Sequence, residues 1–355
     1  MENIKNIAVT GYYGTGSSAV LDFLSEYSNV SWVPINKEVS DYEHVLFYYA
    51  GGLFDLCNQL MHGNTIMGSD AAINRFLDSM NRLYKYNFRW FGSYKKMFGN
   101  QFMDITNEFV KDISVSFNGR NCNHCTRMSL SLKGTIKRLL FSLCHFRFSD
   151  PRVYNYLYDT KDVYLSLPTH DELISATRKY SKAYMGLFPV KKGSEFRLFD
   201  HLIWPQQIED YADYLDSNLK IILTYRDVRD IYIRNKYYNK NPYFPTDIDD
   251  FISVYSRIVK KNVKHPNLIT IQFEDMIYKY EEVEGQLESE MGLDPSQHFN
   301  KQTLFNPNVS IENTQLFRCN KTWYEESKIL AEAMPDLIYD HPYERIPDGQ
   351  KSFAR

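Results

Sequence analysis

Residues 4–24 read Ile-Lys-Asn-Ile-Ala-Val-Thr-Gly-Tyr-Tyr-Gly-Thr-Gly-Ser-Ser-Ala-Val-Leu-Asp-Phe-Leu. The apolar residues Ile7 to Val9 predict a short buried strand, and apolar side chains at helical spacing predict a helix from Ser17. Three glycines break the pattern in between: Gly11, Gly14 and Gly16. A strand, a glycine-rich turn and a helix together favour phosphate binding. Glycine lets the backbone approach a ligand closely, and the first N–H groups of a helix have no internal acceptor.

The glycine spacing fits a phosphate-binding loop with one departure. Gly11 to Gly16 matches the G-x-x-x-x-G of a P-loop, but Ser17 stands where nucleoside-triphosphate enzymes carry a lysine for the β- and γ-phosphates. The missing lysine argues against an ordinary kinase or ATPase. Three glycines together with Thr15, Ser17 and Ser18 are more than a tight turn needs, so phosphate binding is favoured over a turn without a ligand.

The composition is that of an ordinary globular protein. The chain has 355 residues, of which 43% are hydrophobic and 24% charged, enough for one large domain or two small ones. The formal net charge of −3 gives no sign of nucleic-acid binding. Aromatic residues make up 15% of the chain, so rings are abundant for the core and for lining an acceptor pocket.

Cysteine usage and hydropathy indicate a reducing, cytoplasmic location. The cysteines are an odd and sparse set, unlike a disulfide framework. They are Cys57, Cys122, Cys125, Cys144 and Cys319. The first predicted strand begins almost at the N-terminus, which leaves no room for a signal peptide. The sequence holds no apolar run of about 18 residues, so we expect no transmembrane helix.

Short apolar segments alternate with helical ones towards both ends of the chain. Strands are predicted at residues 4–9, 30–33, 196–199, 220–225 and 268–273. Helices are predicted at residues 171–187, 206–215, 227–238, 247–263, 274–291 and 322–334, with a polar loop at 300–321. The alternation predicts an α/β fold with a central parallel sheet flanked by helices, of the P-loop nucleotide-binding type. Residues 42–190 are mostly helical and predict a large insertion that covers the site, a subdomain within one domain of residues 1–355.

A second basic segment follows the strand predicted at 220–225. Arg226 lies where that strand gives way to a helix, and Arg234 lies two turns further on. In a parallel sheet, ligands gather at the carboxyl ends of the strands, the edge that the glycine-rich loop also occupies. Two electropositive strand ends at one edge predict a ligand with two separate phosphates, to which Arg226 would make a forked contact. The alternative is a surface ion-pair network of Arg226, Asp227, Arg229 and Asp230.

Three segments occur in an order that resembles one enzyme family. The glycine-rich loop, the Arg-Asp-Val-Arg-Asp of residues 226–230 and the Asn-Leu-Ile-Thr-Ile-Gln-Phe-Glu-Asp-Met of residues 267–276 resemble the motifs of sulfotransferases that use 3′-phosphoadenosine 5′-phosphosulfate (PAPS). The resemblance covers residues 1–40 and 196–334 and is nearest to bacterial members that modify glycans, lipids or small hydroxyl compounds. It implies a sulfotransferase-like fold and an enzyme that moves a sulfuryl group from PAPS to an acceptor hydroxyl. The product would be adenosine 3′,5′-bisphosphate (PAP).

The resemblance implies roles for individual residues. The loop from Gly11 would hold the 5′-phosphosulfate, through Gly14, Thr15, Gly16, Ser17 and Ser18. Arg226 would hold the 3′-phosphate, together with Arg234 where the family has serine. Before the last helix, Arg318 and Lys321 would lie over the nucleotide. Many members carry Lys or Arg at the position of Gly14, so this chain departs from the family in lacking that cation.

Sulfuryl transfer needs a base for the acceptor's proton and donors for the charge that grows on the leaving phosphate. Sulfate carries less charge than phosphate, so no metal is required. Glu38 follows the second predicted strand, where some bacterial sulfotransferases have a glutamate base. His201, just after the strand at 196–199, and His170, where a helix begins, are the other candidates. For each of them, a solvated or helix-capping role is the alternative.

Two other features are weaker signals. Cys122 and Cys125 with His124, and Cys144 with His145 further on, could bind zinc, but one half-motif in a polar loop is little evidence. The basic, amphipathic residues 133–147 could lie on an anionic membrane surface. An ordinary helix with its apolar face in the core is the simpler interpretation.

The sequence therefore predicts a cytoplasmic, PAPS-dependent sulfotransferase without a metal. Its acceptor would be a small molecule or glycan bearing a hydroxyl, with a lipophilic alcohol such as a sterol favoured by the aromatic content. No nucleic-acid partner is expected, contact with a membrane surface is left open, and the oligomeric state is undetermined. The alternatives are an atypical P-loop kinase, disfavoured because no magnesium-binding acid is evident, and a nucleotide-binding module without catalysis.

Overall fold

The computed structural model describes residues 4–33, 44–88, 91–118, 136, 139–140 and 162–345. The chain divides into two compact units. Unit 1 comprises Met1–His44, Phe188–Asp213 and Ser217–Arg355, and unit 2 comprises Val45–Leu187 and Tyr214–Asp216.

Unit 1 is built on a five-stranded parallel sheet in the order β2-β5-β1-β6-β7. The strands are β1 (Lys5–Gly11), β2 (Val30–Val33), β5 (Phe196–Asp200), β6 (Lys220–Tyr225) and β7 (Leu268–Gln272). Nearly every residue of β1, β5 and β6 is buried, as expected for parallel strands covered on both faces. The predicted α/β fold with a central parallel sheet is confirmed.

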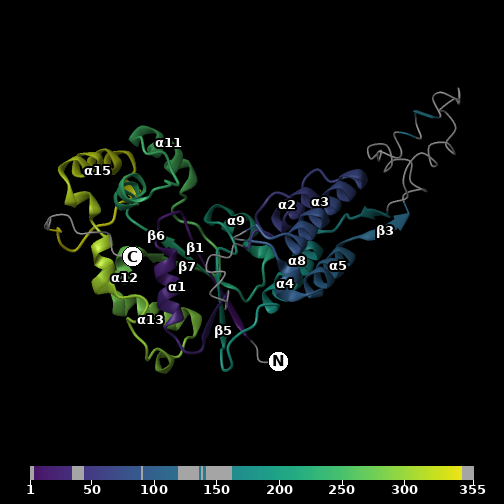
Figure 1. Cartoon of the computed structure of the whole chain (residues 1–355), viewed down its shortest axis with the longest axis horizontal. Helices are drawn as coiled ribbons and strands as arrows, with labels where there is room; N and C mark the ends of the chain where they lie inside the picture. Colours follow the sequence, from purple (N-terminus) through teal and green to yellow (C-terminus); the bar gives the residue numbers. More distant parts are fainter. Residues whose placement is uncertain are drawn as a thin grey trace. The chain divides into compact units, whose positions relative to one another are not determined.

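Helices of unit 1 pack in two apolar clusters. The longer helices are α1 (Ser17–Ser25), α10 (Val228–Ile233), α11 (Ile248–Ile258), α12 (Phe273–Tyr278), α13 (Tyr280–Met291) and α15 (Lys321–Ala333). One cluster joins α1, α12 and α13 to the strands, and these helices run alongside the sheet in Figure 1. The other cluster joins α10, α11 and α15.

Short helical turns connect these elements. They are η2 (Pro205–Gln207), α9 (Ile208–Tyr211), η3 (Ala212–Tyr214), the π-helical η4 (Arg234–Tyr238), η5 (Pro295–Gln297), α14 (Pro307–Ser310), η6 (Ile311–Asn313), η7 (Leu316–Cys319) and η8 (Pro335–Leu337). Several predicted boundaries are therefore wrong. The helix predicted at 206–215 is a series of short turns, and the helix at 227–238 changes to π geometry at Arg234. The helix at 274–291 breaks at Lys279, and residues 300–321 contain helical turns rather than a plain loop.

Unit 2 is mostly helical, as its apolar spacing predicts. Its helices are α2 (Leu53–Met61), α3 (Ile66–Lys85), α4 (Tyr94–Phe98), α5 (Gln101–Ile113) and α8 (His170–Gly186). An antiparallel pair, β3 (Val115–Asn118) and β4 (Asp162–Leu165), was not predicted. Ring contacts among Phe76, Phe109 and Tyr180 fill the space between α3, α5 and α8. In the described part of the chain, no helix combines the length and apolar character needed to span a membrane.

Candidate functional site

The glycine-rich loop between β1 and α1 requires its glycines. Gly14 has φ +85° and Gly16 has φ +91°, both in the left-handed region that other residues rarely adopt. Gly11 is required for space, because a Cβ there would lie 2.3 Å from the Thr224 hydroxyl oxygen and 2.4 Å from that of Thr15. The three glycines therefore fix a tight loop that turns the chain from strand into helix.

The hydroxyls of the loop divide into a buried one and two accessible ones. The Thr15 hydroxyl lies 2.7 Å from the Tyr12 carbonyl oxygen, to which it donates, and 3.0 Å from the Thr224 hydroxyl. Thr15 is 1% exposed, so its side chain serves the loop itself. Ser17 and Ser18 begin α1 at the surface, and Gly16 provides no side-chain cap for the first N–H groups of the helix. These N–H groups remain the natural anion-binding donors of the loop.

Arg226 lies against this loop, as the sequence predicts for two strand ends at one edge. It follows β6, which pairs with β1 in the register Gly11↔Thr224. Its Nη1 donates to the Gly14 carbonyl oxygen at 3.1 Å and its Nη2 to the Asn313 carbonyl oxygen at 2.5 Å. Arg226 is only 3% exposed, and its Nε has no hydrogen-bond partner in the described residues. The described residues also provide no carboxylate within ion-pair distance of this guanidinium.

The surface ion-pair interpretation of residues 226–230 is wrong in two ways. Asp227 and Asp230 are fully buried rather than at the surface. Arg229 pairs with Asp227, its Nη2 lying 2.5 Å from Oδ2, and Arg226 takes no part in that pair. Burial raises the pKa of Asp227, but the contacts from His341 and Arg229 outweigh it and hold that pKa below its usual range.

Arg234 adds a second cation beside Arg226. It is the first residue of the π-helical turn η4, a geometry that often occurs at functional sites. Burial, and after it the nearby charge of Arg226, lowers the pKa of Arg234 to about 10. The two guanidinium groups repel each other in the free protein, and an anion bound between them would reduce that repulsion.

Two buried carboxyl groups support the Arg226 strand end. Glu274, at the start of α12, accepts a hydrogen bond from the Asp227 N–H at 3.0 Å and is fully buried. Burial, followed by the charge of Asp227, raises the pKa of Glu274 to about 8. Asp230 accepts from the N–H groups of Gln315 and Leu316, both at 2.7 Å, and burial raises its pKa to about 6. Glu274 thus fixes the backbone that presents Arg226.

His201 lies at the same sheet edge. Its N–H donates to the Val9 carbonyl oxygen of β1 at 2.9 Å, just before the glycine-rich loop. Its Nδ1 lies 2.5 Å from Oδ1 of Asp200, and both side chains are partly exposed, 23% for His201 and 31% for Asp200. His201 has φ +48°, which is uncommon for a residue other than glycine. The backbone of His201, the runner-up base of the sequence prediction, is therefore bonded to the strand that leads into the glycine-rich loop, and its side chain lies near a carboxylate that was not predicted as a site residue.

A row of aromatic rings extends from His201. The Trp204 ring lies 5.7 Å from His201, Tyr13 lies 5.2 Å from Trp204, and Tyr243 stacks on Tyr13 at 4.7 Å. Tyr13 is 43% exposed and Tyr243 64% exposed. These rings were not predicted as site residues, although the position of Tyr13 inside the glycine-rich loop was a signal. They offer an apolar surface next to the candidate base.

The other predicted site residues are described one by one. His170 is the first residue of α8 in unit 2, is 61% exposed and lies 3.8 Å from Asp171. Arg318 pairs with Glu344 at 2.9 Å, and Lys321 is exposed at the start of α15. Glu38 lies outside the described residues, as do Cys122, Cys125, Cys144 and most of residues 133–147.

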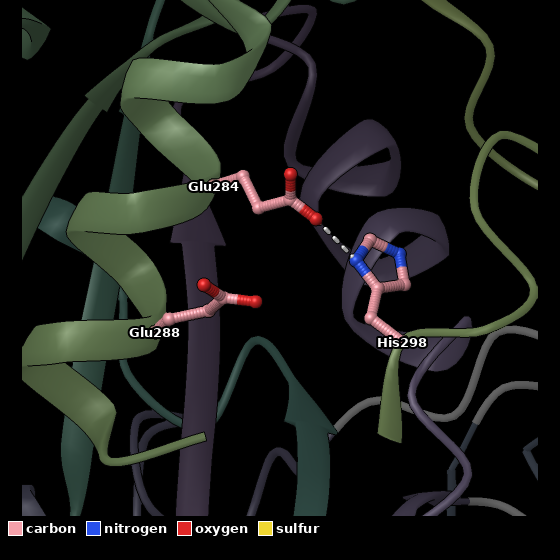
Figure 2. A group of neighbouring side chains, drawn as sticks. All are labelled: Glu284, Glu288 and His298. Atoms are coloured by element: carbon pink, nitrogen blue, oxygen red, sulfur yellow. Dashed lines mark hydrogen bonds and ion pairs between the residues drawn. The ribbon is translucent and has the colours of Figure 1, made fainter. Parts of the chain in front are cut away.

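A second group of ionisable side chains lies elsewhere in unit 1. Figure 2 shows Glu284 and Glu288 on successive turns of α13, with Glu284 bonded to His298. The potential ligand atoms of the three residues lie within 4.8 Å of one another, which is compatible with a metal site. Protein groups already satisfy them, however. His298 contacts Glu284 through Nδ1 at 2.6 Å and Glu26 through Nε2 at 2.9 Å.

Further contacts complete this His298 cluster. Lys301 Nζ lies 2.6 Å from Glu284, and the Tyr27 hydroxyl donates to Glu288 at 3.0 Å. Glu26 also accepts from three backbone N–H groups, those of Gln302, Leu304 and Phe305. The cluster joins the end of α1, α13 and the segment after residue 298, and we interpret it as structural.

The chain was also compared with protein-family models, with curated proteins and with solved structures, and none of the three comparisons gave a significant match.

Proposed function

We propose that this chain is a PAPS-dependent sulfotransferase. The observation that carries the proposal is Arg226, a buried guanidinium that contacts the carbonyl of Gly14 in the glycine-rich loop and has a free Nε. The glycine-rich loop and the start of α1 would form one anion-binding position. Arg226 and Arg234 would form a second one at the same edge of the sheet. A nucleotide with a 5′-phosphosulfate and a 3′-phosphate would occupy both anion-binding positions. A nucleotide with a single phosphate chain would need only the position at the glycine-rich loop.

The reaction would proceed by in-line transfer. The acceptor oxygen forms a bond to sulfur as the bond from sulfur to the bridging phosphate oxygen breaks, and PAP leaves. The acceptor's proton passes to a base, for which His201 is the candidate supported by geometry, while Glu38 stays a prediction. The first N–H groups of α1 stabilise the charge that grows on the leaving phosphate. They take the place of the family cation that Gly14 cannot supply.

The acceptor would be a hydroxyl compound with an apolar face. The ring of Trp204 contacts His201 and Tyr13 contacts Trp204, and ring surfaces of this kind favour a lipophilic alcohol or the apolar face of a sugar. We further propose a cytoplasmic location, with which the free thiols of Cys57 and Cys319 agree.

A second candidate function rests on the strand order. Asp200 ends β5, the direct neighbour of β1, and P-loop NTPases hold Mg²⁺ with an acid that follows a strand and a Ser or Thr of the loop. By its position at a strand end, Asp200 would be the candidate acid for Mg²⁺ in that function. A Mg²⁺-dependent phosphoryl transferase is the alternative, still disfavoured by the missing loop lysine.

Calorimetric titration separates the candidates. We expect PAP to bind in EDTA and more tightly than adenosine 5′-monophosphate, and ATP to bind weakly with or without Mg²⁺. Arg226→Ala should weaken PAP binding, whereas Arg257→Ala, which removes an exposed arginine from α11, should not. Tight binding of ATP only with Mg²⁺ would favour the phosphoryl transferase and contradict the proposal.

A further inference from the structure

Two arginines of unit 1 contact successive carbonyl oxygens of one short stretch of chain. Arg226 donates through Nη2 to the Asn313 carbonyl oxygen at 2.5 Å. Arg345 donates through Nη1 to the carbonyl oxygens of the two neighbouring residues, Glu312 at 2.9 Å and Thr314 at 2.8 Å. This stretch of three residues therefore links the two guanidinium groups.

Further hydrogen bonds fix Arg345 on the same stretch. Its Nη2 lies 2.5 Å from Oε2 of Glu312, and its own N–H donates to Oε1 of Gln315 at 2.9 Å. Gln315 is 1% exposed and also donates through Nε2 to the Tyr343 carbonyl oxygen at 2.9 Å. Both the side chain and the backbone of Arg345 are thus bonded to residues 312–315. A planar guanidinium suits such a set of acceptors, because its donors have fixed directions.

The backbone after this stretch is held in an uncommon conformation. Gln315 has φ +52°, in the left-handed region that residues other than glycine rarely adopt. The N–H groups of Gln315 and Leu316 donate to the buried Asp230 carboxylate, both at 2.7 Å. Backbone of this kind persists where the surrounding structure requires it. Asp230 and Arg345 are two of the groups that impose it, so the direction of the Asn313 carbonyl depends on both.

Arg226 depends on that carbonyl for its own orientation. The carbonyl oxygens of Gly14, at 3.1 Å from Nη1, and of Asn313 are its hydrogen-bond acceptors among the described residues. The Phe273 ring packs against the group, with its centre 4.8 Å from the guanidinium carbon. A shift of the Asn313 carbonyl would therefore turn the guanidinium beside the glycine-rich loop.

We propose that Arg345 is a positioning residue for Arg226. By holding the carbonyl groups of Glu312 and Thr314, it directs the Asn313 carbonyl towards the Arg226 guanidinium and thereby fixes that guanidinium for the 3′-phosphate of the bound nucleotide. The inference rests on the proposed sulfotransferase function for its ligand. Arg345 follows the last predicted helix, outside the segments that resemble sulfotransferases.

The first test measures PAP binding by calorimetry. Arg345→Ala should weaken PAP binding about 2- to 30-fold, the range expected for a residue that acts on a site through its neighbours. Arg345→Lys should recover part of the affinity, because it keeps the charge but not the planar fork of donors. Arg257→Ala, which removes an exposed arginine of α11, should bind PAP as the parent does.

A double-mutant cycle shows whether Arg345 acts through Arg226. If it does, Arg345→Ala should cause no further loss of PAP affinity in a chain that already carries Arg226→Ala. A general contribution of Arg345 to the fold would weaken binding equally in both backgrounds. Circular dichroism checks that each variant is folded.

The Nε–H signal of Arg226 in ¹H–¹⁵N NMR provides a measurement that needs no ligand. Its absence in Arg226→Ala assigns it. In Arg345→Ala, its chemical shift and its rate of exchange with water should change, whereas Arg257→Ala should leave both unchanged. Failure of the parent to bind PAP would refute the proposed function, and the NMR comparison would still decide about Arg345.

Two outcomes would overturn the inference. The first is a folded Arg345→Ala protein with the parent's PAP affinity and the parent's Arg226 signal. The second is an equal loss of PAP affinity from Arg345→Ala with and without Arg226. If Arg345→Ala does not fold, Arg345→Lys takes its place in the cycle and in the NMR comparison, and the same two outcomes decide.

Discussion

Two groups of buried charges in unit 1 differ in how completely the chain satisfies them. In the His298 cluster, both ring nitrogens of His298 contact carboxylates. Lys301 also contacts Glu284, and Tyr27 donates to Glu288. Beside the glycine-rich loop, Arg226 is just as buried, but its Nη groups bond only to neutral carbonyls and its Nε bonds to none of the described residues.

The difference indicates what each group is for. Burying a charge costs free energy unless the charge is paired. The chain pairs the charges of the His298 cluster but gives Arg226 only neutral hydrogen-bond partners, so we infer different roles for the two groups. The His298 cluster uses its charges to hold helices together. Arg226 makes no ion pair within the described residues, although the buried Asp230 and Glu274 interact with it electrostatically. Under the proposed function, its guanidinium would contact a bound anion. Residues of the first group should therefore affect folding, and residues of the second should affect binding or turnover.

The largest expected effect concerns turnover. His201→Ala should lower kcat about 10²- to 10⁴-fold, the usual effect of removing a general base, while PAP affinity and the thermal unfolding midpoint stay near those of the parent. Initial rates with PAPS and a panel of sterol, phenol and sugar acceptors provide the measurement. Glu38→Gln is the matched variant, because Glu38 is the first-choice base of the sequence prediction.

The two variants decide between the bases. A Glu38→Gln protein without turnover, together with an active His201→Ala protein, would assign the base to Glu38. If both variants stay active, proton removal lies elsewhere, and His170 becomes the next residue to test.

The second prediction concerns the contribution of the His298 cluster to stability. His298→Ala should lower the free energy of unfolding by about 3–5 kcal/mol, because it leaves Glu26 and Glu284 buried without the imidazole that both of them contact. Lys301→Ala should cost less, since Lys301 is 49% exposed and water can replace it. Urea denaturation measures both. An unchanged unfolding free energy with a metal-dependent increase in stability would instead make the cluster a metal site.

Much of the fold was predictable because local signals agreed with the tertiary structure. Apolar runs such as residues 220–225 gave the parallel strands, and the glycines of the phosphate loop correspond to left-handed or crowded backbone positions. The approach of Arg226 to the loop followed from sheet topology alone. Helix ends were predicted less well, because the π-helical turn at Arg234 and the break at Lys279 depend on packing rather than on periodicity.

The remaining site features depend on contacts that sequence spacing does not encode. The contact between Asp200 and His201 occurs at a left-handed residue, and histidine gives no sequence sign of that conformation. The surface interpretation of residues 226–230 was made because charged residues are ordinarily exposed to solvent. It was wrong because Asp227 and Asp230 are buried. The antiparallel β3–β4 pair joins residues that are 44 to 50 positions apart in the sequence, from Asn118 with Asp162 to Val115 with Leu165. No local pattern marks it.

The third prediction concerns Arg226 itself. Arg226→Ala should weaken PAP binding by about 1.5–3 kcal/mol, the scale of a hydrogen bond to a charged group. Calorimetry measures the affinity, and circular dichroism checks that the variant is folded. Unchanged affinity in a folded variant would make Arg226 a structural residue that ties Gly14 to Asn313.

The fourth prediction uses Glu274, which supports the same edge. Its pKa is about 8 in the folded protein against an ordinary 4.5, so the folded chain holds a proton that the unfolded chain releases between these values. The stability that Glu274 contributes is therefore lost as the pH rises from about 4.5 to 8. Relative to the parent, Glu274→Gln should gain up to about 1.4 kcal/mol of stability for each pH unit in this range. Denaturation at pH 5, 6, 7 and 8 measures it, and parallel curves for the two proteins would contradict it.

The smallest effect should come from Arg234, and its two parts should have opposite signs. Burial and the charge of Arg226 lower the pKa of Arg234 to about 10, so its charged form is disfavoured in the free, folded protein. Arg234→Ala should therefore leave the unfolding free energy unchanged or raise it by about 0.5–1 kcal/mol. The same change should weaken PAP binding by about 0.5–1.5 kcal/mol and reduce its salt dependence, because one cation is lost from the site. Arg234→Lys keeps the charge and should retain more of the affinity. If the Arg234→Ala protein loses stability but binds PAP as tightly as the parent does, Arg234 has a structural role, like the residues of the His298 cluster.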